Sequence, residues 1–451
     1  MKQSIAVICL SLGLAACAVG PNYQQPEINL EQRFIAGNAE QANEVAKLRW
    51  WNDYQDPLLT ELVSEGLSQN LDVIAATERI RQALANLRTK GVNASLGGDL
   101  SGSITRSGGD NITTDTTRSM QLGASFVIDL FGGVRRDRES AVASLVAAQA
   151  DVETTRLAWL AEVISAYSNA RYYQTAMVLA NDTIATREET VEITQHRFDL
   201  GDITEYELAE AQALLASAQA TLPEYLARYN ASVFTLSTLM NQPSSIMMQR
   251  IDAEASQLPI PMAPMTGLPT DLLRNRPDIR SAEASLEAAV ANVGVAQADL
   301  YPSLTLSGSL ARTNGADGWS FGPSILMPLF NQGALRAAKD SKVSLAKQAE
   351  IDWRAQVLAA VEDVHVAQSN LEQYQLRADA LMKAASFYER ALELAKRNYR
   401  AGAITLLDLL DTDRSTASAR VSAASAVNDA AQAWASLQLA IGAGAAATNE
   451  N

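Results

Sequence analysis

The feature that most constrains this chain is an internal duplication. Gly201 and Gly402 lie 201 residues apart (402 − 201 = 201), and the letters around them are similar: "FDLGDITEYELAE" at 198–210 and "YRAGAITLLDLLD" at 399–411. Internal repeats determine an architecture before any single motif does. We therefore expect one structural unit to be built twice.

Each repeat is predicted to hold a helix, a strand pair, a long helix, a glycine turn and a returning helix. The repeats are expected at 61–240 and 270–441. A linker rich in proline and serine at 241–269 separates them, and a flexible tail covers 442–451. The expected elements are strands at about 99–106 and 119–130, a long helix at 133–200 and a return helix at 203–240, then strands at about 303–312 and 319–329, a long helix at 333–400 and a return helix at 404–441.

A seven-residue apolar repeat predicts that the long helices pack side by side. The series in the first repeat is Val163, Ala170, Met177, Ile184, Val191 and Phe198, copied as Val364, Leu371, Ala378, Ala385, Leu392 and Tyr399. No proline interrupts 133–200. At 1.5 Å per residue such a helix is about 100 Å long, whereas the hydrocarbon of a bilayer is ~30 Å thick. A compact enzyme has no use for such a rod.

The predicted strands alternate strictly between apolar and polar residues. In "SLTLSGSLAR" at 303–312 the leucines face one side and the serines and threonine face the other. About ten residues suit a tilted membrane strand, although an antiparallel soluble sheet alternates in the same way. The polar stretch "RSGGDNITTDTTR" at 106–118 predicts an exposed loop.

Four strands are too few to close a ring by themselves. Membrane-spanning β-structure must close, because lipid cannot satisfy an open edge, and the smallest common bacterial barrels have about eight strands. We therefore predict a mixed α and β membrane protein in which several copies share one β-barrel that is continued by a helical barrel.

The N-terminus reads as a secretion signal. Residues 1–16 combine Lys2 with a short apolar run, and "LAAC" at 14–17 matches a lipoprotein cleavage site, which predicts a covalent lipid such as palmitate on Cys17. An ordinary signal peptide with a chance cysteine is the alternative. The lipidated N-terminal segment is expected to be extended over 17–60.

Composition excludes several functions. A net charge of −15 argues against nucleic acid as a partner. Only two histidines occur, without HExxH or CxxC, so no metal site, cofactor or enzyme activity is expected. Four methionines cluster around the linker and would suit either Cu(I) binding or irregular packing: Met247, Met248, Met262 and Met265.

The block "LPTDLLRNRPDIRSAEASLEAAVANVGVAQADLYPSLTLSGSLA" at 268–311 resembles the signature of TolC-type outer-membrane efflux channels. "CAVGPNYQQPE" at 17–27 and "WWNDYQDPLLTELV" at 50–63 are similar to the lipoprotein branch that serves RND pumps, the OprM-like or NodT family. The first repeat departs from the pattern, with "SLGG" at 95–98 in place of "YPSL" at 301–304. The resemblance implies a homotrimer with four strands per chain, anchored and inserted in outer-membrane lipid and extending into the periplasm.

The same resemblance implies a passive exit duct of a tripartite multidrug efflux system, with a periplasmic adaptor and an inner-membrane RND pump as partners. Leu407 and Asp411 are then expected to constrict the closed pore, and Tyr399 and Arg414 to latch neighbouring helices. Export of metal ions or of polypeptides (type I secretion), and a lipid-anchored coiled-coil tether, are the alternatives. The tip residues expected to contact the adaptor, rather than to form bare turns, are Leu200, Gly201, Asp202, Ile203, Thr204, Ala401, Gly402, Ala403, Ile404 and Thr405.

Overall fold

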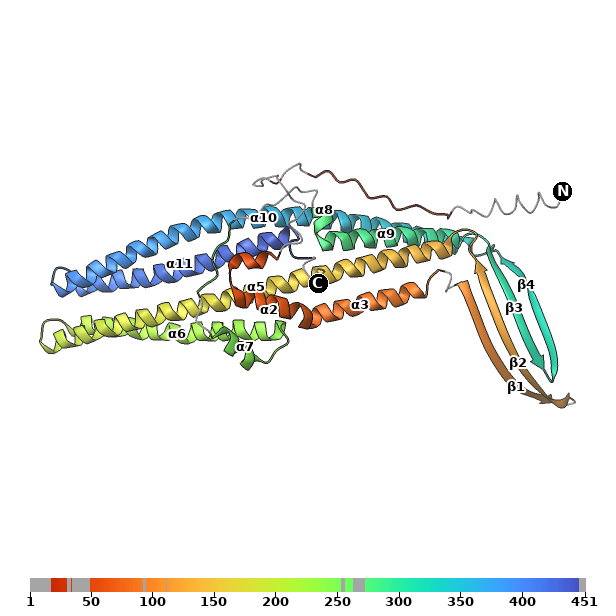
Figure 1. Ribbon diagram of the computed structural model, residues 1–451, viewed down its shortest axis with the longest axis horizontal. Helices are drawn as coiled ribbons and strands as arrows, with labels where there is room; N and C mark the ends of the chain where they lie inside the picture. The colour runs from red at the N-terminus through yellow and green to blue at the C-terminus, as the bar shows by residue number, and fades with distance from the viewer. Residues whose placement is uncertain are drawn as a thin grey trace. The chain divides into compact units, whose positions relative to one another are not determined.

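The computed structural model describes residues 18–30, 34, 49–91, 95–110, 112–252, 256–262 and 272–445 (Figure 1). The predicted signal peptide, Cys17 and Met265 lie outside these residues. The chain divides into two compact units. Unit 1 is Met1–Asn29, Ala76–Val152 and Asp278–Val357, and unit 2 is Leu30–Ala75, Glu153–Pro277 and Leu358–Asn451.

The order of elements is the same in the two repeats, and the mixed α and β class is confirmed. The first repeat contains α2 (Pro57–Gln69), α3 (Leu71–Arg88), β1 (Leu96–Gly109), β2 (Ile112–Ile128), α5 (Gly133–Asp199) and α6 (Glu205–Leu239). The second contains α8 (Leu272–Asn275), α9 (Pro277–Ala298), β3 (Ser303–Thr313), β4 (Ala316–Leu326), α10 (Gln332–Arg400) and α11 (Leu406–Ala440). A 3-10 helix, η2 (Trp50–Tyr54), precedes the first repeat, and α7 (Ser244–Ile251) lies between the repeats.

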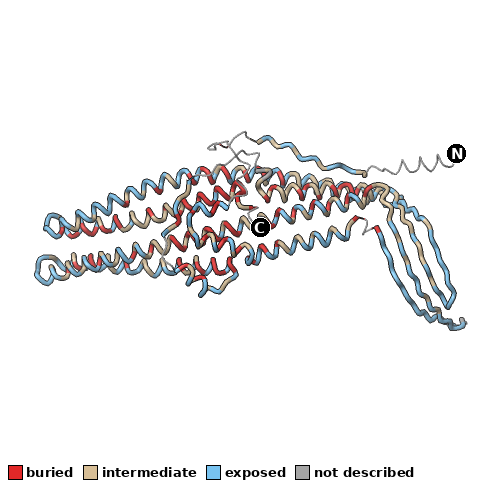
Figure 2. The backbone as a smooth tube through the Cα atoms, in the orientation of Figure 1, coloured by how far each residue is buried: buried red, intermediate tan, exposed pale blue. Residues whose placement is uncertain are grey.

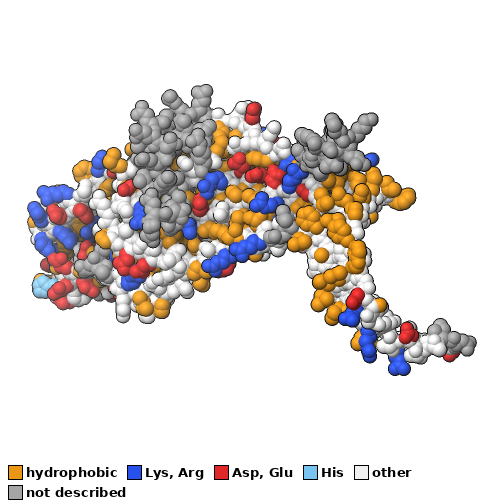
Figure 3. Space-filling model, turned by 45° about the vertical axis from the view of Figure 1, so that its right-hand side comes forward, with side chains coloured by type: hydrophobic (Ala, Val, Ile, Leu, Met, Phe, Trp, Pro, Cys, Tyr) orange, Lys and Arg blue, Asp and Glu red, His pale blue; other side chains and the backbone are white. Residues whose placement is uncertain are grey.

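Unit 1 carries one antiparallel sheet of order β1-β2-β3-β4, so β2 and β3 join the strands of the two repeats. Leu122 lies opposite Leu310, which in turn lies opposite Trp319, and this register gathers the large apolar side chains on one face. Serine, threonine and glycine occupy the other face, where Ser309 and Ser320 share a hydrogen bond. Figure 3 shows hydrophobic side chains over much of the visible sheet, with charged ones near the strand ends. The alternation predicted from the sequence is therefore realised as an amphipathic sheet.

The prediction of an exposed loop at 106–118 is wrong. β1 and β2 remain paired as far as Ser107 and Asp115, so most of this stretch belongs to the strands. The four threonines of "ITTDTT" at 112–117 favour extended backbone, so that β1 ends at Gly109 and β2 begins at Ile112. β4 also lies three residues earlier than predicted, ending at Leu326 shortly before Pro328.

Unit 2 holds most of two helical hairpins: α5 from Glu153 onward with α6, and α10 from Leu358 onward with α11 (Figure 1). Figure 2 shows their buried residues along the inner faces, while the strands of unit 1 are largely exposed. Small residues predominate in this core: Ala378, Ala426 and Ala430 form one buried cluster. No helix in the described part of the chain has both the length and the apolar character that a membrane span requires.

Two predicted segments are more ordered than expected. The supposedly extended 17–60 includes η2 and the start of α2, because Trp50 and Tyr54 bury their rings against Trp434. The Trp50 indole N–H donates to the carbonyl of Ala443. Residues 442–445 are therefore packed against η2, and the flexible tail predicted for them is wrong.

The linker also has structure, in the form of α7. Arg171 and Gln174 of α5 both donate to the carbonyl of Ile251 at the end of α7. The described linker methionines differ in their surroundings, since Met247 is fully buried and Met262 is 91% exposed. Irregular packing explains Met247.

Candidate functional site

The turns at the two hairpin ends have the same backbone. Gly201 and Gly402 both have positive φ, +81° and +72°. The amide of Asp202 donates to the carbonyl of Arg197, and that of Ala403 to the carbonyl of Asn398, at 2.9 and 2.8 Å. Nothing lies within 4 Å of a Cβ placed at either glycine. The left-handed conformation that ends each helix, and not crowding, therefore requires glycine.

Each return helix begins with a capping box. Thr204 and Glu207 exchange side-chain and backbone hydrogen bonds at the start of α6, and Thr405 and Asp408 do so at the start of α11. The backbone N–H of Thr204 holds the pKa of Glu207 below its ordinary value. The hydroxyl of Thr405 does the same for the pKa of Asp408. The T-x-x-[E/D] spacing was present in the sequence and could have identified both caps.

The predicted gate residues Leu407 and Asp411 lie one helical turn apart on the exposed side of α11. Leu407 is 45% exposed, and the Asp411 side chain is 80% exposed. Arg414 lies 3.7 Å from Asp411 on the same helix and is also exposed. The opposite side of α11 is buried. This face therefore presents an apolar group, an acid and a base in succession.

Tyr399 does not lie with that exposed face. It is buried with Leu406, Leu409, Leu410 and Ala211 in a cluster that joins both hairpins, which we call the tip cluster. The guanidinium of Arg197 lies 5.2 Å from the centre of the Tyr399 ring. The Tyr399 hydroxyl has no hydrogen-bond partner among the described residues. The structure therefore separates Tyr399 from Arg414, and a latch to a neighbouring helix stays a prediction for both.

A buried ion pair fastens the second hairpin to the first, and no pattern in the sequence predicted it. Arg187 of α5 donates from Nε to Asp413 of α11 at 2.7 Å, and each side chain is 8% exposed. The same guanidinium donates to the carbonyl of Leu214. The partners are 226 residues apart in the chain, so only the fold brings them together.

Exposed ion pairs continue this connection on both sides. Arg400 of α10 pairs with Glu189 of α5, and Arg420 of α11 lies 3.5 Å from Asp182 of α5. Exposed pairs of this kind contribute little stability individually. They nevertheless show that three residues of α5 between 182 and 189 contact the second hairpin.

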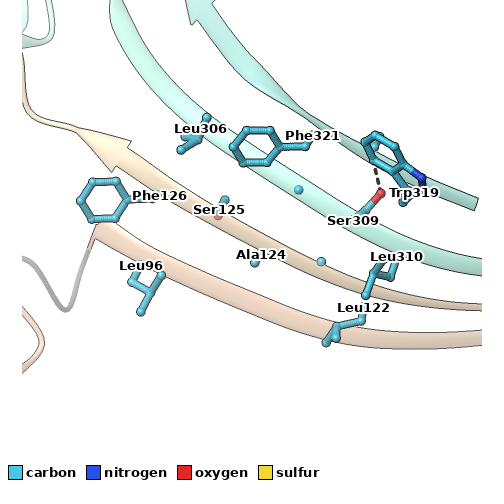
Figure 4. A pocket seen from close by; sticks show the side chains of 13 residues that line it. Leu96, Leu122, Ala124, Ser125, Phe126, Leu306, Ser309, Leu310, Trp319 and Phe321 are labelled. Atoms are coloured by element: carbon cyan, nitrogen blue, oxygen red, sulfur yellow. Dashed lines mark hydrogen bonds between the residues drawn. The ribbon is translucent and has the colours of Figure 1, made fainter.

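The apolar face of the sheet in unit 1 forms a shallow groove of about 440 Å³ (Figure 4). Phe126, Leu306, Leu310 and Phe321 surround it, and Gly308 leaves room at its centre. No charged group lines it, and most of its lining is apolar, so it suits an apolar partner. Among the described residues, no cluster of histidine, cysteine, aspartate and glutamate could hold a metal ion.

An amphipathic four-stranded sheet combined with two long helical hairpins defines a class of outer-membrane channels. The chain belongs to the outer membrane efflux protein family, whose model matches residues 62–242 and 268–443. It is similar to Nodulation protein T of Rhizobium leguminosarum bv. trifolii, with 37% identity over 96% of both chains. It is also 30% identical to the pyoverdine export outer membrane protein OpmQ of Pseudomonas aeruginosa, over 98% of this chain and 96% of OpmQ.

Solved structures show the same fold. The outer-membrane channel OprN matches with a TM-score of 0.81 and 30% identity, over 95% of this chain and 100% of OprN. The open-state MtrE outer membrane channel of Neisseria gonorrhoeae matches with a TM-score of 0.83 and 28% identity, over 96% and 100%. The resemblance inferred from 268–311 is therefore confirmed.

Proposed function

We propose that this chain is the outer-membrane exit duct of a tripartite RND-type multidrug efflux system. Three copies form one β-barrel, continued by a helical barrel in the periplasm. The duct is passive and opens at the hairpin tips on contact with an adaptor and pump. A lipid on Cys17 anchors it. The observation that carries the proposal is the amphipathic sheet, whose apolar face suits lipid and whose serine-rich face suits water.

Strand pairing supports assembly from several copies. β1 and β4 are the edge strands of the sheet, and each leaves one row of backbone groups unpaired. Lipid offers such groups no hydrogen bonds. Pairing β4 of one copy with β1 of the next removes both edges and makes the ring of about twelve strands that a trimer requires.

A stripe of exposed apolar side chains on α10 supports the same assembly. Its members, spaced by whole helical turns, are Ile351, Leu358, Leu376, Phe387 and Leu394, which are 43–75% exposed. Single exposed apolar residues are common, but five on one face of the same helix indicate an interaction surface. A neighbouring copy in a ring is the partner that would cover it.

The relatives support an efflux role. OpmQ is named for pyoverdine export, and a toluene efflux pump outer membrane protein of Pseudomonas putida is 28% identical over 92% of this chain. Both names describe outward transport of small molecules. At the tips, exposed Leu407 and Asp411 suit an apolar and an acidic ring around a pore axis.

Single-channel recording tests the proposal. The purified protein should have the mass of three chains and give discrete conductance steps in a planar bilayer. Leu407→Ala and Asp411→Ala should raise the conductance, whereas Leu200→Ala, which also removes an exposed leucine from a tip, should not. Absence of steps would favour the lipid-anchored tether, and equal conductance in every variant would disprove the gate.

The cargo requires a separate test. A strain that lacks the gene should become sensitive to small organic toxins, and expression of the wild-type chain should restore resistance. Sensitivity to copper or silver alone, or loss of a secreted polypeptide, would instead assign one of the other cargo classes.

A further inference from the structure

The described residues that follow Cys17 are fastened to unit 1. We call residues 18–23 the strap. The amide of Val19 donates to the carbonyl of Phe131 at 3.0 Å, in the connection between β2 and α5. Phe131 stacks on Tyr301, with ring centres 4.7 Å apart, and Tyr301 lies in the connection between α9 and β3. The strap is therefore fixed where strands become helices.

One buried guanidinium holds the strap at three points. Arg136 of α5 is 4% exposed. It donates to the carbonyls of Val19 and Gly20 at 3.4 and 3.5 Å, and to Oδ1 of Asn22 at 2.5 Å. Its Nη1 pairs with Glu139 at 2.7 Å. The planar guanidinium of arginine can donate to several acceptors at once. We call the Arg136 side chain, with its hydrogen bonds to the strap, the clasp.

The strap also touches backbone directly, through glycines. Gly20 has φ +93°, and a Cβ there would lie 2.5 Å from Cα of Gly294 on α9. Gly132 has φ +81°, and a Cβ there would lie 2.6 Å from Cα of Ala18. A Cβ on Gly294 would meet the Arg136 side chain at 2.8 Å. Only glycine permits these approaches, so the seat is closely fitted to the strap.

We propose that this seat, and not the lipid, fixes the N-terminus of the mature protein, with Arg136 as the positioning residue. The inference takes the lipid on Cys17 from the proposed function. Consecutive Cα atoms are 3.8 Å apart, and Ala18 lies against Gly132. A lipid on Cys17, the residue before Ala18, therefore begins close to Gly132, which is four residues beyond the end of β2. The acyl chains are then attached where the strands meet the helices, and are not carried on a flexible tether.

The test uses the lone thiol of the mature chain. The sequence has two cysteines, and Cys9 lies in the signal peptide. An ordinary secretion leader that leaves Cys17 as the first residue yields full-length protein without lipid, whose thiol takes a nitroxide. In lipid vesicles, the label should be immobile with Arg136 present and at least ~10-fold more mobile in Arg136→Ala, because the clasp is then gone. Arg136→Lys should behave like Arg136→Ala, since lysine lacks the fork.

Matched variants separate the clasp from general damage. Lys90→Ala removes an ion pair from Asp137 on the same stretch of α5 and should leave the label immobile. Asn22→Ala alters only the strap and should give intermediate mobility, which keeps the test valid if Arg136→Ala fails to fold. A mobile label in the unlipidated chain with Arg136 intact would overturn the inference.

Two further measurements distinguish this inference from the proposed function. In the natural protein, exchange of the Val19 amide with deuterium should be slow and should accelerate at least ~10-fold in Arg136→Ala. Mass spectrometry of the N-terminal peptide reports the lipid on Cys17, and bilayer recording reports the duct. A protected amide without conductance refutes the duct alone, whereas conductance with an unprotected amide refutes the seat alone.

Discussion

The two hairpin tips share a backbone and differ in what holds them. Both have a left-handed glycine and a threonine cap. At positions 201 apart, however, Leu406, Leu410 and Asp413 of α11 are buried, whereas their counterparts Glu205, Ala209 and Gln212 of α6 are exposed. Tyr399 is 5% exposed and its counterpart Phe198 is 36% exposed.

The two copies of the duplicated unit therefore keep the same turn, whereas the side chains that pack around the turn have diverged. The second tip is fastened to the first hairpin by the tip cluster and by the Arg187–Asp413 pair. The first tip exposes Leu200 and Tyr206, which are 65% and 67% exposed. We infer that the second tip can separate from the first hairpin, and that the first tip offers apolar contacts to a partner protein.

The largest expected effect comes from breaking the buried ion pair. Asp413→Ala leaves the Arg187 guanidinium buried without its carboxylate, which costs about 3–5 kcal/mol of stability. The midpoint of thermal unfolding in detergent should fall sharply, and amide exchange should accelerate in 182–189 and 409–416. Arg390→Ala, which breaks the exposed pair with Glu393, should cost at most about 1 kcal/mol.

A double substitution checks the cause. Arg187→Met combined with Asp413→Leu replaces two buried charges by apolar groups of similar size, and should recover most of the lost stability. If the double variant is as unstable as Asp413→Ala alone, the loss comes from packing and not from the unpaired charge.

The next effect compares leucines at the two tips. Leu409→Ala leaves a cavity in the tip cluster and should cost about 2–5 kcal/mol. Leu200→Ala removes an exposed side chain and should change stability by no more than about 0.5 kcal/mol. Denaturant titration of the purified protein measures both, and equal losses at the two tips would contradict the asymmetry.

Substitution of the two turn glycines should, in contrast, cost the same stability at both tips. Gly201→Ala and Gly402→Ala each force an alanine into a left-handed conformation with open space around it, so each should cost about 1–2 kcal/mol. The same denaturant titration applies. A much larger cost at Gly402 would mean that the second turn is held by contacts other than its backbone.

The smallest effect is a pH dependence at the caps. The pKa values of Glu207 and Asp408 are lowered in the folded protein. Their stabilising contribution is therefore present at neutral pH and is lost as pH falls below about 4 through these lowered values. The thermal midpoints of wild type and Asp408→Asn should differ at pH 7 and converge in acid. A constant difference across that range would assign the effect to packing.

Structural features that depend on periodicity could be predicted from the sequence, whereas contacts between distant residues could not. The duplication, the alternating strands and both glycine turns follow from local patterns, and the order of elements is as predicted. The extent of β1 and β2 was underestimated, because polar threonines resemble a loop when only hydrophobicity is read. The packing of Trp50 against Ala443 and the Arg187–Asp413 pair could not be predicted, because each joins residues more than 200 positions apart.

The most direct test of the gated duct is to cross-link its second tips. Ala401→Cys places a reactive thiol in a mature chain whose Cys17 is proposed to carry a lipid, and Leu200→Cys is the matched variant at the first tip. Asp413→Ala breaks the buried pair that fastens the second hairpin, so we expect it to raise the conductance. A short bifunctional thiol reagent should join up to three chains through position 401 and abolish that expected rise, whereas position 200 should leave it intact. If cross-linking at 401 joins no chains, or leaves the conductance of Asp413→Ala as high as before, the second hairpin does not close the duct.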